Sequence, residues 1–416
     1  MILSEQHIFK RGSKAFSEFE KLCRNANNLY NATMYCVRQE FFSGTVLTYE
    51  TVNKKFIQEK QTDYYSLPTK ISQQIQRIIS SAWKSYFRAI RDYKKNPSKY
   101  LGKPKIPSYR EKGGLYVVPF TIQSIAFNTI NVPRGFLRLS GTSVLIKTKQ
   151  KEIQAARLVP QDRNHIKVEI LYNVECPEVR HNGRIASIDL GVNNLATIVY
   201  PNSRTEIING RPLKSINQYY NKKLAEIRSR NAKHEHQTRR EVSLISKRRN
   251  KINDYLHKAS RYIVNQLVSN DVTELVIGYN AGWKQDMKLG RAGHSRKEGN
   301  QRFQFIPFYK FIGMLTYKCA LAGIAVTTNE ESYTSKCSFL DNEEVCKHAE
   351  YKGKRVKRGL FRASNGRLIN ADVNGALNIL KKYLEKVVRN KEGILNSLDL
   401  IEVCSTPSVY TVKLAA

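Results

Sequence analysis

The sequence predicts an α+β protein with more than one domain. Apolar residues recur at helical spacing over residues 13–93, and alternating branched and aromatic residues with frequent turns follow over residues 113–172. Short apolar runs typical of strands, and further helical stretches, occupy the chain from residue 185 onward. A chain of 416 residues is long enough for two or three domains and a sizeable core.

The first part of the chain combines one strand with a helical region. Residues 1–12 are strand-like, and apolar residues then step by three and four from Phe16 to Ile90, which is typical of helices packed on a core. Three prolines over residues 96–110 break the helices. We therefore expect a helical domain over residues 13–110.

Four stretches rich in branched and aromatic residues come next. They cover residues 115–121, 124–132, 143–149 and 165–174. Together with the opening strand they predict a small β-barrel made of residues 1–12 and 111–180, with the helical domain inserted after its first strand. A further domain then begins near residue 181.

The charge of the chain indicates a polyanionic partner. Lys and Arg number 70 against 35 Asp and Glu, which leaves a net charge of +35. Such a charge repels itself in a compact protein unless a polyanion offsets it, and 23 tyrosines supply stacking surfaces for unpaired bases. We expect nucleic-acid binding whose affinity falls steeply with salt.

Other classes of protein fit the composition less well. The seven cysteines are odd in number and irregularly spaced, which does not indicate a disulfide framework and fits a reducing compartment. The opening residues lack the apolar core of a signal peptide, and no window of 18 consecutive apolar residues occurs. We expect a cytoplasmic protein that does not span a membrane.

Basic residues concentrate in a long helical pair predicted over residues 215–267. A charge run is often only a solvated face, but these runs are nearly all of one sign, which favours a track for phosphates. The basic face of the first helical region is a second candidate. The nucleic-acid candidates in these two regions are Lys84, Arg88, Arg239, Arg240, Lys247, Arg248 and Arg249.

The first candidate catalytic residue is Asp189. The stretch Arg184 to Thr197 reads as a strand, a tight turn and a second strand, and Asp189 lies where the first strand ends. A carboxylate beside a core needs a partner or a metal, although an Asp at this place could also serve only to form the turn.

The second candidate is Asp372. It stands among small residues just before apolar residues that recur at helical spacing, so it lies at or near a helix N-terminus, where negative charge is favoured. It could be a simple N-cap. Paired with Asp189, however, it indicates a site for divalent cations, because two carboxylates repel each other unless cations bridge them.

Three motifs, SIDLGVNNLAT, ESYTSKCS and INADVNGALNIL, begin at Ser187, Glu331 and Ile369. In this order they resemble the signatures of the TnpB (OrfB) proteins of bacterial transposons. The resemblance implies a RuvC-like nuclease of the RNase H type, related to type V CRISPR effectors, over residues 181–384. It also implies that the barrel and the helical region are the wedge and recognition domains, which grip a guide RNA and read a short DNA motif.

The chain departs from this family at Gly278. The resemblance implies a third catalytic carboxylate at the end of the strand over residues 274–283, and glycine stands there instead. The next strand ends at Glu330 and Glu331, and in this topology it lies beside the strand of Gly278. We favour Glu331 as the replacement ligand, with Glu330 close behind; the alternative is a solvent-facing acidic pair. Asp189, Asp372 and Glu331 would then hold two Mg²⁺ ions.

A second departure concerns zinc. Many TnpB proteins carry two CxxC pairs in the lid, which here covers residues 332–368 and holds only Cys337, Cys346 and His348. Because structural zinc needs four ligands, we expect this lid to be metal-free. A basic hairpin over residues 351–363 follows. Its candidates for contact with nucleic acid are Lys354, Arg355, Lys357 and Arg358.

The resemblance implies an RNA-guided, Mg²⁺-dependent DNA endonuclease, with a guide RNA from the transposon end and double-stranded target DNA as partners. The alternative is a guide-dependent repressor that has lost cutting, which Gly278 favours. The hypothesis of a transposase that joins DNA strands itself has less support, because nothing in the sequence resembles a strand-transfer tyrosine. The tail over residues 385–416 shows no clear match, and we expect it to be partly disordered.

Overall fold

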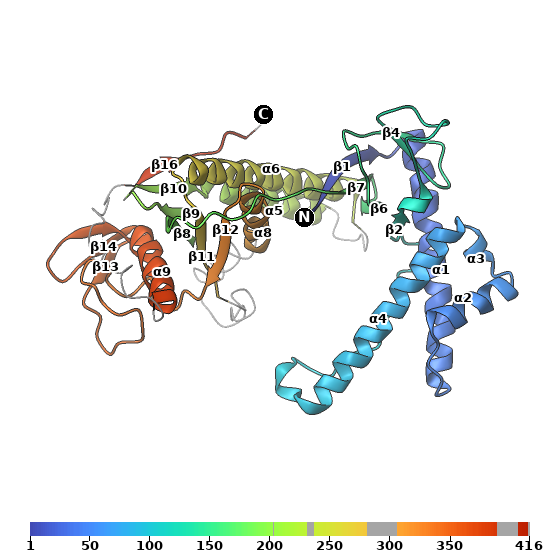
Figure 1. The fold of residues 1–416 in the computed structure, drawn as a ribbon, viewed down its shortest axis with the longest axis horizontal. Helices are drawn as coiled ribbons and strands as arrows, with labels where there is room; N and C mark the ends of the chain where they lie inside the picture. The colour runs from blue at the N-terminus through green and yellow to red at the C-terminus, as the bar shows by residue number, and fades with distance from the viewer. Residues whose placement is uncertain (203, 231–236, 281–305, 389–406, 415–416) are drawn as a thin grey trace. The chain divides into compact units, whose positions relative to one another are not determined.

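The computed structural model shows a mixed α+β protein (Figure 1). It describes residues 1–416 except for 203, 231–236, 281–305, 389–406 and 415–416. The chain forms two compact units, Met1–Val174 and Glu175–Ala416. Among the described residues, no helix is both long enough and apolar enough to cross a membrane.

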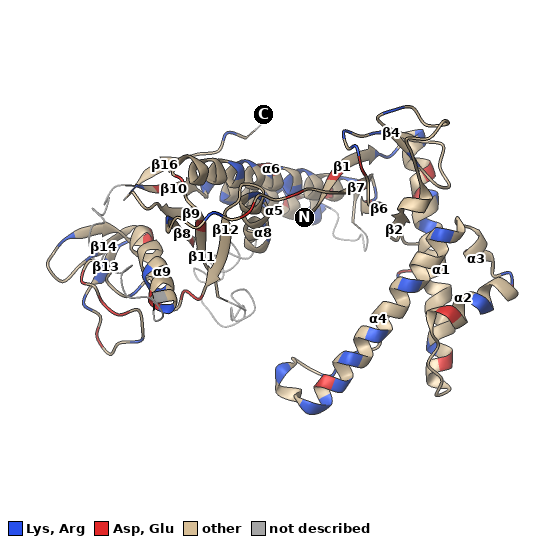
Figure 2. Cartoon of the chain, viewed as in Figure 1, with Lys and Arg blue, Asp and Glu red and all other residues tan. Residues whose placement is uncertain are grey.

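The helices of the first unit confirm the helical pattern of the sequence. Ser13 caps the first helix, because its side chain accepts a hydrogen bond from the backbone N–H of Phe16 at 3.2 Å. Lys84 and Arg88 are exposed on the last of these helices, along which several positions are Lys or Arg (Figure 2). The four α-helices are α1 (Lys14–Phe42), α2 (Tyr49–Gln58), α3 (Thr62–Tyr65) and α4 (Thr69–Lys95).

The strands of the first unit form two open antiparallel sheets, so the expected barrel does not close. The opening strand pairs with the last strand of the unit, which brings the two ends of this segment together. The four-stranded sheet has the order β1 (Ile2–Lys10), β7 (His165–Asn173), β6 (Ala155–Asp162), β2 (Val118–Thr121). The three-stranded sheet has the order β3 (Ile125–Phe127), β4 (Phe136–Leu139), β5 (Leu145–Lys147).

Helices and strands of the first unit share one hydrophobic core. Phe19 of α1, Ile75 of α4 and Ile170 of β7 belong to the same cluster of buried side chains. The expected division into a barrel (1–12 and 111–180) and a helical domain (13–110) therefore does not correspond to two cores. The unit ends at Val174, directly after β7, rather than at residue 180.

The second unit is built on a mixed sheet, to which six described strands belong. Its order is β12 (Ala325–Asn329), β11 (Glu274–Gly278), β8 (Ile185–Leu190), β9 (Asn194–Val199), β10 (Thr205–Asn209), β16 (Ser408–Tyr410). Strands β8, β9 and β10 are antiparallel neighbours, whereas β11 runs parallel to β8 and β12 parallel to β11. The strand of Gly278 thus lies beside the strand that leads to Glu330 and Glu331, as the sequence predicted.

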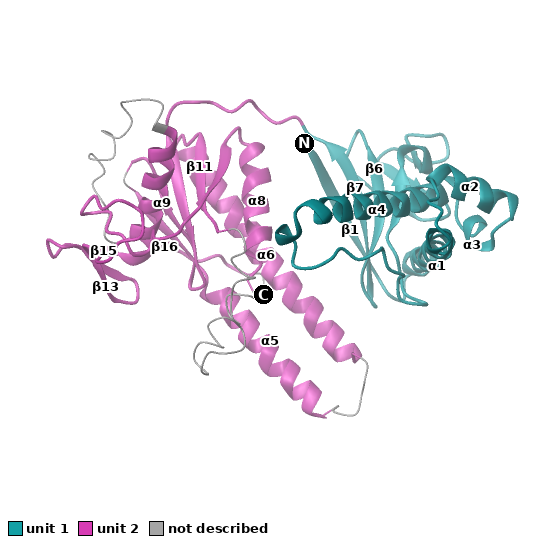
Figure 3. Cartoon of the chain, turned by 90° about the horizontal axis from the view of Figure 1, so that it is seen from below, with its two compact units in different colours: residues 1–174 teal, residues 175–416 magenta. Residues whose placement is uncertain are grey.

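Helices cover both faces of this sheet (Figure 3). Ala186 and Ile188 of β8 belong to the core that helices α6 (Arg239–Ser269) and α8 (Phe308–Ala320) complete. Ser187, between them, faces the opposite way and donates to the backbone oxygen of Ala376 in α9 (Ala371–Val388) at 2.7 Å. Helix α5 (Arg211–Arg230) pairs with α6, which confirms the long basic helical pair.

A small three-stranded sheet of the second unit precedes α9. Its strands are β13 (Lys354–Lys357), β14 (Leu360–Arg362) and β15 (Leu368–Asn370), and all neighbours are antiparallel. The basic hairpin predicted over residues 351–363 is therefore present. Its last strand leads directly into the helix that carries Asp372.

The described part of the C-terminal tail is ordered. Helix α9 continues to Val388, and β16 adds a parallel strand to the edge of the sheet at β10. The ring of Tyr410 stacks on Tyr262 of α6 with centroids 3.5 Å apart and an interplanar angle of 3°. Val412 is only 3% exposed, so this segment belongs to the core of the second unit; residues 389–406 of the tail lie outside the described residues.

Replacing Val412 with Asp tests this role of the tail. The change places an unpaired carboxylate in the core, and we expect it to lower the melting temperature of the second unit by roughly 5–10 °C. Val409→Asp is the matched control, because Val409 is 64% exposed on the same segment and should change little. Calorimetry of both variants makes the comparison; equal melting temperatures would show that the segment does not contribute to the fold.

Candidate active site

Asp189 lies near the end of β8 on the face of the sheet that α9 covers. Strand alternation places it on the same side as Ser187, which is bonded to α9. The side chain is half-buried, and a Cβ atom added to Gly375 of α9 would lie only 2.9 Å from its Oδ2. Glycine at position 375 therefore makes room for the carboxylate between strand and helix.

Asp372 lies in the first turn of α9, as predicted, but it is not the N-cap. Asn370 caps the helix: its Oδ1 accepts from the backbone N–H groups of Asp372 at 2.9 Å and Val373 at 3.2 Å. The carboxylate of Asp372 accepts from Asn194 Nδ2 at 2.6 Å and from Arg355 Nη2 at 3.1 Å. The side chain is thus directed toward the turn that follows Asp189.

Glu331 occupies the space next to Gly278. In the parallel pairing of β11 with β12, Gly278 is opposite Asn329, two residues before Glu331. A Cβ atom on Gly278 would lie 3.0 Å from Glu331 Oε2 and would clash with the side chain of Ile379. The backbone N–H of Glu331 donates to Asn280 Oδ1 at 3.0 Å, which fixes the chain at this point. The missing side chain at 278 therefore leaves space that Glu331 and Ile379 fill.

Glu330 is engaged elsewhere. Its carboxylate forms an ion pair with Lys382 of α9 and accepts from the backbone N–H of Ser332 at 2.8 Å. Partial burial alone would raise the pKa of Glu330, but the hydrogen bonds from Lys382 and Ser332 together lower it to about 2. Of the two candidates, the structure brings Glu331, and not Glu330, to the strand end at Gly278.

The electrostatics of Asp189 and Glu331 are those of crowded acids. Burial, and then the charges of Glu331 and Asp372, raise the pKa of Asp189 well above its ordinary value, while Arg355 opposes this rise. Burial, and then the charge of Glu330, raise the pKa of Glu331 to about 7. Glu331 Oε2 is buried and has no hydrogen-bond partner among the described residues.

The donor chemistry suits a hard divalent cation. Carboxylate oxygens are preferred ligands of Mg²⁺, and a buried carboxylate oxygen without a donor beside a second crowded acid is what a cation would relieve. In the described part of the chain, no three Asp, Glu, His or Cys side chains converge closely enough to hold an ion as they stand. The carboxylate of Asp372 is instead held by Asn194 and Arg355.

Three residues of the site were not singled out from the sequence. Asn194 holds Asp372, and Asn280 holds the backbone of Glu331. Asn193, with its amide oxygen turned toward the guanidinium, accepts from Arg358 Nε at 3.2 Å. Asn193 and Asn194 lie in and after the turn that follows β8, and Asn280 lies just after β11, which ends at Gly278; these positions were the available signal. Arg355 and Arg358, predicted only as contacts for nucleic acid, also reach the site.

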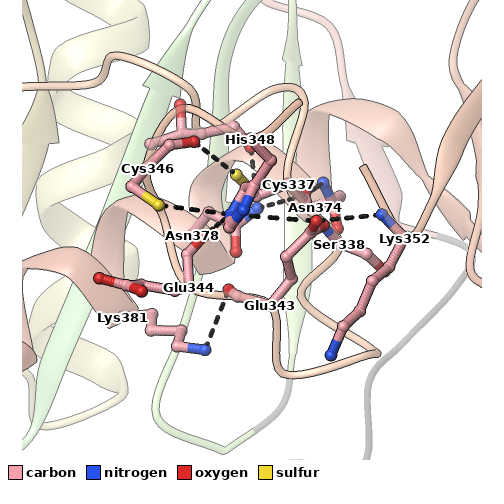
Figure 4. Close-up of polar contacts among 11 residues, drawn as sticks. Cys337, Ser338, Glu343, Glu344, Cys346, His348, Lys352, Asn374, Asn378 and Lys381 are labelled. Carbon is pink, nitrogen blue, oxygen red and sulfur yellow. Dashed lines mark hydrogen bonds and ion pairs between the residues drawn. The ribbon is translucent and has the colours of Figure 1, made fainter. Parts of the chain in front are cut away.

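The lid is organised around a buried glutamate (Figure 4). The carboxylate of Glu343 accepts from the backbone N–H groups of Ser338 at 2.7 Å and Lys352 at 3.0 Å. Cys337 Sγ donates to the backbone oxygen of Cys346 at 3.5 Å, and Cys346 Sγ lies 3.4 Å from His348 Nε2. That the lid binds no zinc stays a prediction.

Two asparagines attach the lid to α9 (Figure 4). Asn374 donates to the backbone oxygen of Cys337 at 2.9 Å and accepts from the backbone N–H of Phe339 at 3.0 Å. Asn378 donates to the same oxygen of Cys337 at 2.7 Å and to that of Thr334 at 2.8 Å. The lid is thus fixed to the helix that carries Asp372.

Two family models match the parts of the chain that form this site. The OrfB_IS605 model, described as a probable transposase, matches residues 165–284, which include Asp189 and Gly278. The Cas12f1-like TNB domain model matches residues 308–379, which include Glu331 and Asp372. Over these two segments the chain is similar to the OrfB (TnpB) transposase family and to the Cas12f1-like TNB domain.

Two curated proteins are similar to about half of this chain. The TnpB-like protein ORF457 of Acidianus two-tailed virus is 26% identical over 215 residues, which cover 49% of this chain and 43% of that protein. The CRISPR-associated endodeoxyribonuclease Cas12f2 of a Micrarchaeota archaeon is 29% identical over 230 residues, which cover 52% of this chain and 40% of that protein. The matched segments thus span less than half the length of either relative.

Two solved structures are also similar to this chain. The Cas12f1–sgRNA–target DNA complex matches with a TM-score of 0.35 and 17% identity, over 91% of this chain and 98% of that chain. A CRISPR–Cas12f ternary complex matches with a TM-score of 0.36 and 15% identity, over 88% of this chain and 82% of that chain.

The raised pKa of Glu331 predicts how stability depends on pH in the metal-free protein. Glu331 is protonated in both folded and unfolded states below pH about 4.5, and between that pH and about 7 the unfolded state loses its proton first. Wild-type stability therefore falls over this window. Glu331→Gln should remove that loss, so that its melting temperature exceeds that of wild type at pH 8 and approaches it at pH 4.5.

Glu330→Gln is the matched control and should have the opposite sign. Because the pKa of Glu330 is lowered to about 2, its ionised form stabilises the folded state above that range, and the variant should be less stable than wild type at pH 8. Thermal unfolding at both pH values measures this. If both variants shift the melting temperature at pH 8 in the same direction, the pKa of Glu331 is not raised as described.

Proposed function

We propose that this protein is an RNA-guided, Mg²⁺-dependent DNA endonuclease, which cuts DNA that matches a guide RNA from the transposon end, next to a short motif. The observation that carries the proposal is the position of Glu331. It places a carboxylate against Gly278, where the family resemblance implies a ligand and the chain has none. Asp189, Asp372 and Glu331 then provide the carboxylate set that such a nuclease requires.

The sheet of the second unit supports this proposal. Three antiparallel strands, β8 to β10, are followed at the side of β8 by the parallel strands β11 and β12, which is the arrangement expected of an RNase H-type domain. Asp189 and Glu331 come from the ends of strands in this sheet, and Asp372 comes from the start of the helix packed on it. The proposal therefore assigns a RuvC-like nuclease to this unit.

Asp189, Asp372 and Glu331 would hold the metal. Two bound Mg²⁺ ions supply an activated water and stabilise charge on the leaving oxygen of a phosphodiester. Asn194 orients the carboxylate of Asp372. Arg355, which is exposed and bonded to Asp372, can donate to a phosphate oxygen of the strand to be cut. Because burial favours the protonated acids, ionisation of Asp189 and Glu331 requires positive charge nearby, which couples the site to its cation.

The nucleic-acid partners are proposed from charge and from the names of the relatives. The net charge of +35 suits a large RNA together with DNA. Exposed basic residues of α4, of α6 and of the β13–β14 hairpin are the candidates for backbone contacts. They are Lys84, Arg88, Arg239, Arg240, Lys247, Lys354, Arg355, Lys357 and Arg358.

A guide-dependent repressor is the second candidate function. The observation in its favour is Gly278, because an RNase H-type site without one of its carboxylates normally loses activity. The repressor would bind guide RNA and target DNA and leave the DNA intact.

Alanine variants of the carboxylates separate the two functions. Asp189→Ala, Asp372→Ala and Glu331→Ala should each reduce plasmid cleavage by roughly a hundredfold or more, since each removes a ligand of the metal, and should leave RNA binding unchanged. Glu330→Ala is the matched control and should cut like wild type. The measurement is Mg²⁺-dependent cleavage of a plasmid that matches the sequenced co-purifying RNA.

Three results would contradict this account. Cutting that survives Asp189→Ala or Asp372→Ala would place the site elsewhere. If Glu331→Ala cuts like wild type, the assignment of Glu331 as the third metal ligand is wrong. A wild type that binds its target and never cuts would support the repressor.

Gly278→Glu further tests whether Glu331 replaces the carboxylate that the resemblance implies at position 278. Alone it should not improve cleavage, because Glu331 and Ile379 already fill the space beside Gly278. In a Glu331→Ala background it should restore part of the cutting only when Ile379→Ala relieves the clash.

A further inference from the structure

The pair of helices α5 and α6 carries a groove of about 670 Å³ that lies away from the candidate active site. From Ile252 onward, one face of α6 contributes side chains to the core beneath the sheet, whereas the residues of α6 that line the groove all precede Ile252. In Figure 3 this part of the pair extends beyond the sheet. The volume falls within the usual range for a small-molecule site.

The floor and the rim of this α5–α6 groove differ in chemistry. Ile216, Ile227 and Leu244 provide an apolar floor, and two tyrosines, Tyr219 and Tyr220, join it. The rim carries cations, with Arg240, Lys247 and Lys251 all exposed on α6. None of the described residues that line the groove is acidic.

Two carboxylates that adjoin lining residues in the sequence are already paired. Glu241, next to Arg240, forms a capping box with Thr238 and bonds Arg228 Nε at 3.1 Å. Glu226 pairs with Lys223 at 2.8 Å. The positive charge of the rim on α6 therefore faces the groove without a carboxylate of the lining to balance it, and this charge complements an anion.

Arg248 packs against the ring of Tyr220, whereas the ring of Tyr219 is exposed. The guanidinium of Arg248 lies 4.9 Å from the ring centroid of Tyr220, and its Nε donates to Asn217 Oδ1 at 2.7 Å. Arg248, predicted as a phosphate contact, therefore supports the wall of the groove. Tyr219 is 61% exposed, which leaves its ring open to a ligand.

We propose that this groove binds an unpaired nucleotide of the guide RNA, an assignment that rests on the proposed function. The base would stack on Tyr219 over the apolar floor, and the flanking phosphates would contact Lys247 and Lys251. An aromatic slot selects unpaired bases, because the faces of paired bases are covered by their neighbours in a helix. The hydroxyls of Ser215 and Ser243 also line the groove, and they can bond a ribose 2′-hydroxyl, which favours RNA over DNA.

The test uses the full chain and a fluorescent single-stranded RNA of twelve nucleotides, without Mg²⁺ or target DNA. Tyr219→Leu should weaken binding by roughly 5–100-fold and leave its dependence on salt unchanged, because it removes stacking and no charge. Tyr219→Phe, the matched control, keeps the ring and should bind like wild type. Lys247→Gln should lower the salt slope by about 0.7, the value for one phosphate contact on a single strand.

Crosslinking gives an independent readout. The same RNA with 4-thiouridine should crosslink to peptides of α5 that contain Tyr219, and Tyr219→Leu should abolish those crosslinks. Unchanged affinity in Tyr219→Leu, or crosslinks only elsewhere, would overturn the groove assignment. Equal or tighter binding of the matching DNA oligonucleotide would overturn the choice of RNA.

The groove and the nuclease fail in different ways. A wild type that binds the RNA, but in which Tyr219→Leu has no effect, contradicts the groove alone. If Tyr219→Leu weakens RNA binding as expected but the wild type never cuts matched DNA, the endonuclease proposal is contradicted and the groove assignment is still supported.

Discussion

The close packing of α9 on the sheet of the second unit determines the site. At Gly278 and Gly375 there is no side chain between strand and helix, and the space is taken by Glu331, Ile379 and the carboxylate of Asp189. Two acids are thereby held where water is scarce, and both have raised pKa values. Burying charged groups without partners destabilises a fold, so this arrangement is favourable only with a cation or with protonated acids.

The same helix organises the surroundings of the site. Its first turn carries Asp372, and its Asn374 and Asn378 hold the lid. Its Lys382 forms an ion pair with Glu330, which keeps the carboxylate of Glu330 from the strand end at Gly278. Arg355 of the basic hairpin reaches back to Asp372 and offsets part of the negative charge. Helix α9 therefore connects the candidate carboxylates with the lid and with the basic hairpin.

The sequence predicted those parts of the site that depend on local pattern. Asp189 at a strand end, Asp372 at a helix start and the neighbouring strands of Gly278 and Glu331 follow from periodicity and resemblance. The choice between Glu330 and Glu331 stayed open, because two residues beyond a strand end can point either way until Lys382, far along the chain, engages one of them. Barrel closure, the shared core of the first unit and strand β16 depend on pairing between distant segments, which local pattern does not encode.

Binding of Mn²⁺ to the RNA-free protein, followed by electron paramagnetic resonance, tests the central claim most directly. It reports on the ligand set without requiring guide RNA, target or catalysis. The account predicts that wild type and Glu330→Ala bind Mn²⁺ alike, whereas Glu331→Ala and Asp189→Ala bind it at least about tenfold more weakly. Mn²⁺ affinity that is the same in Glu331→Ala as in wild type would show that the carboxylate beside Gly278 is not a ligand.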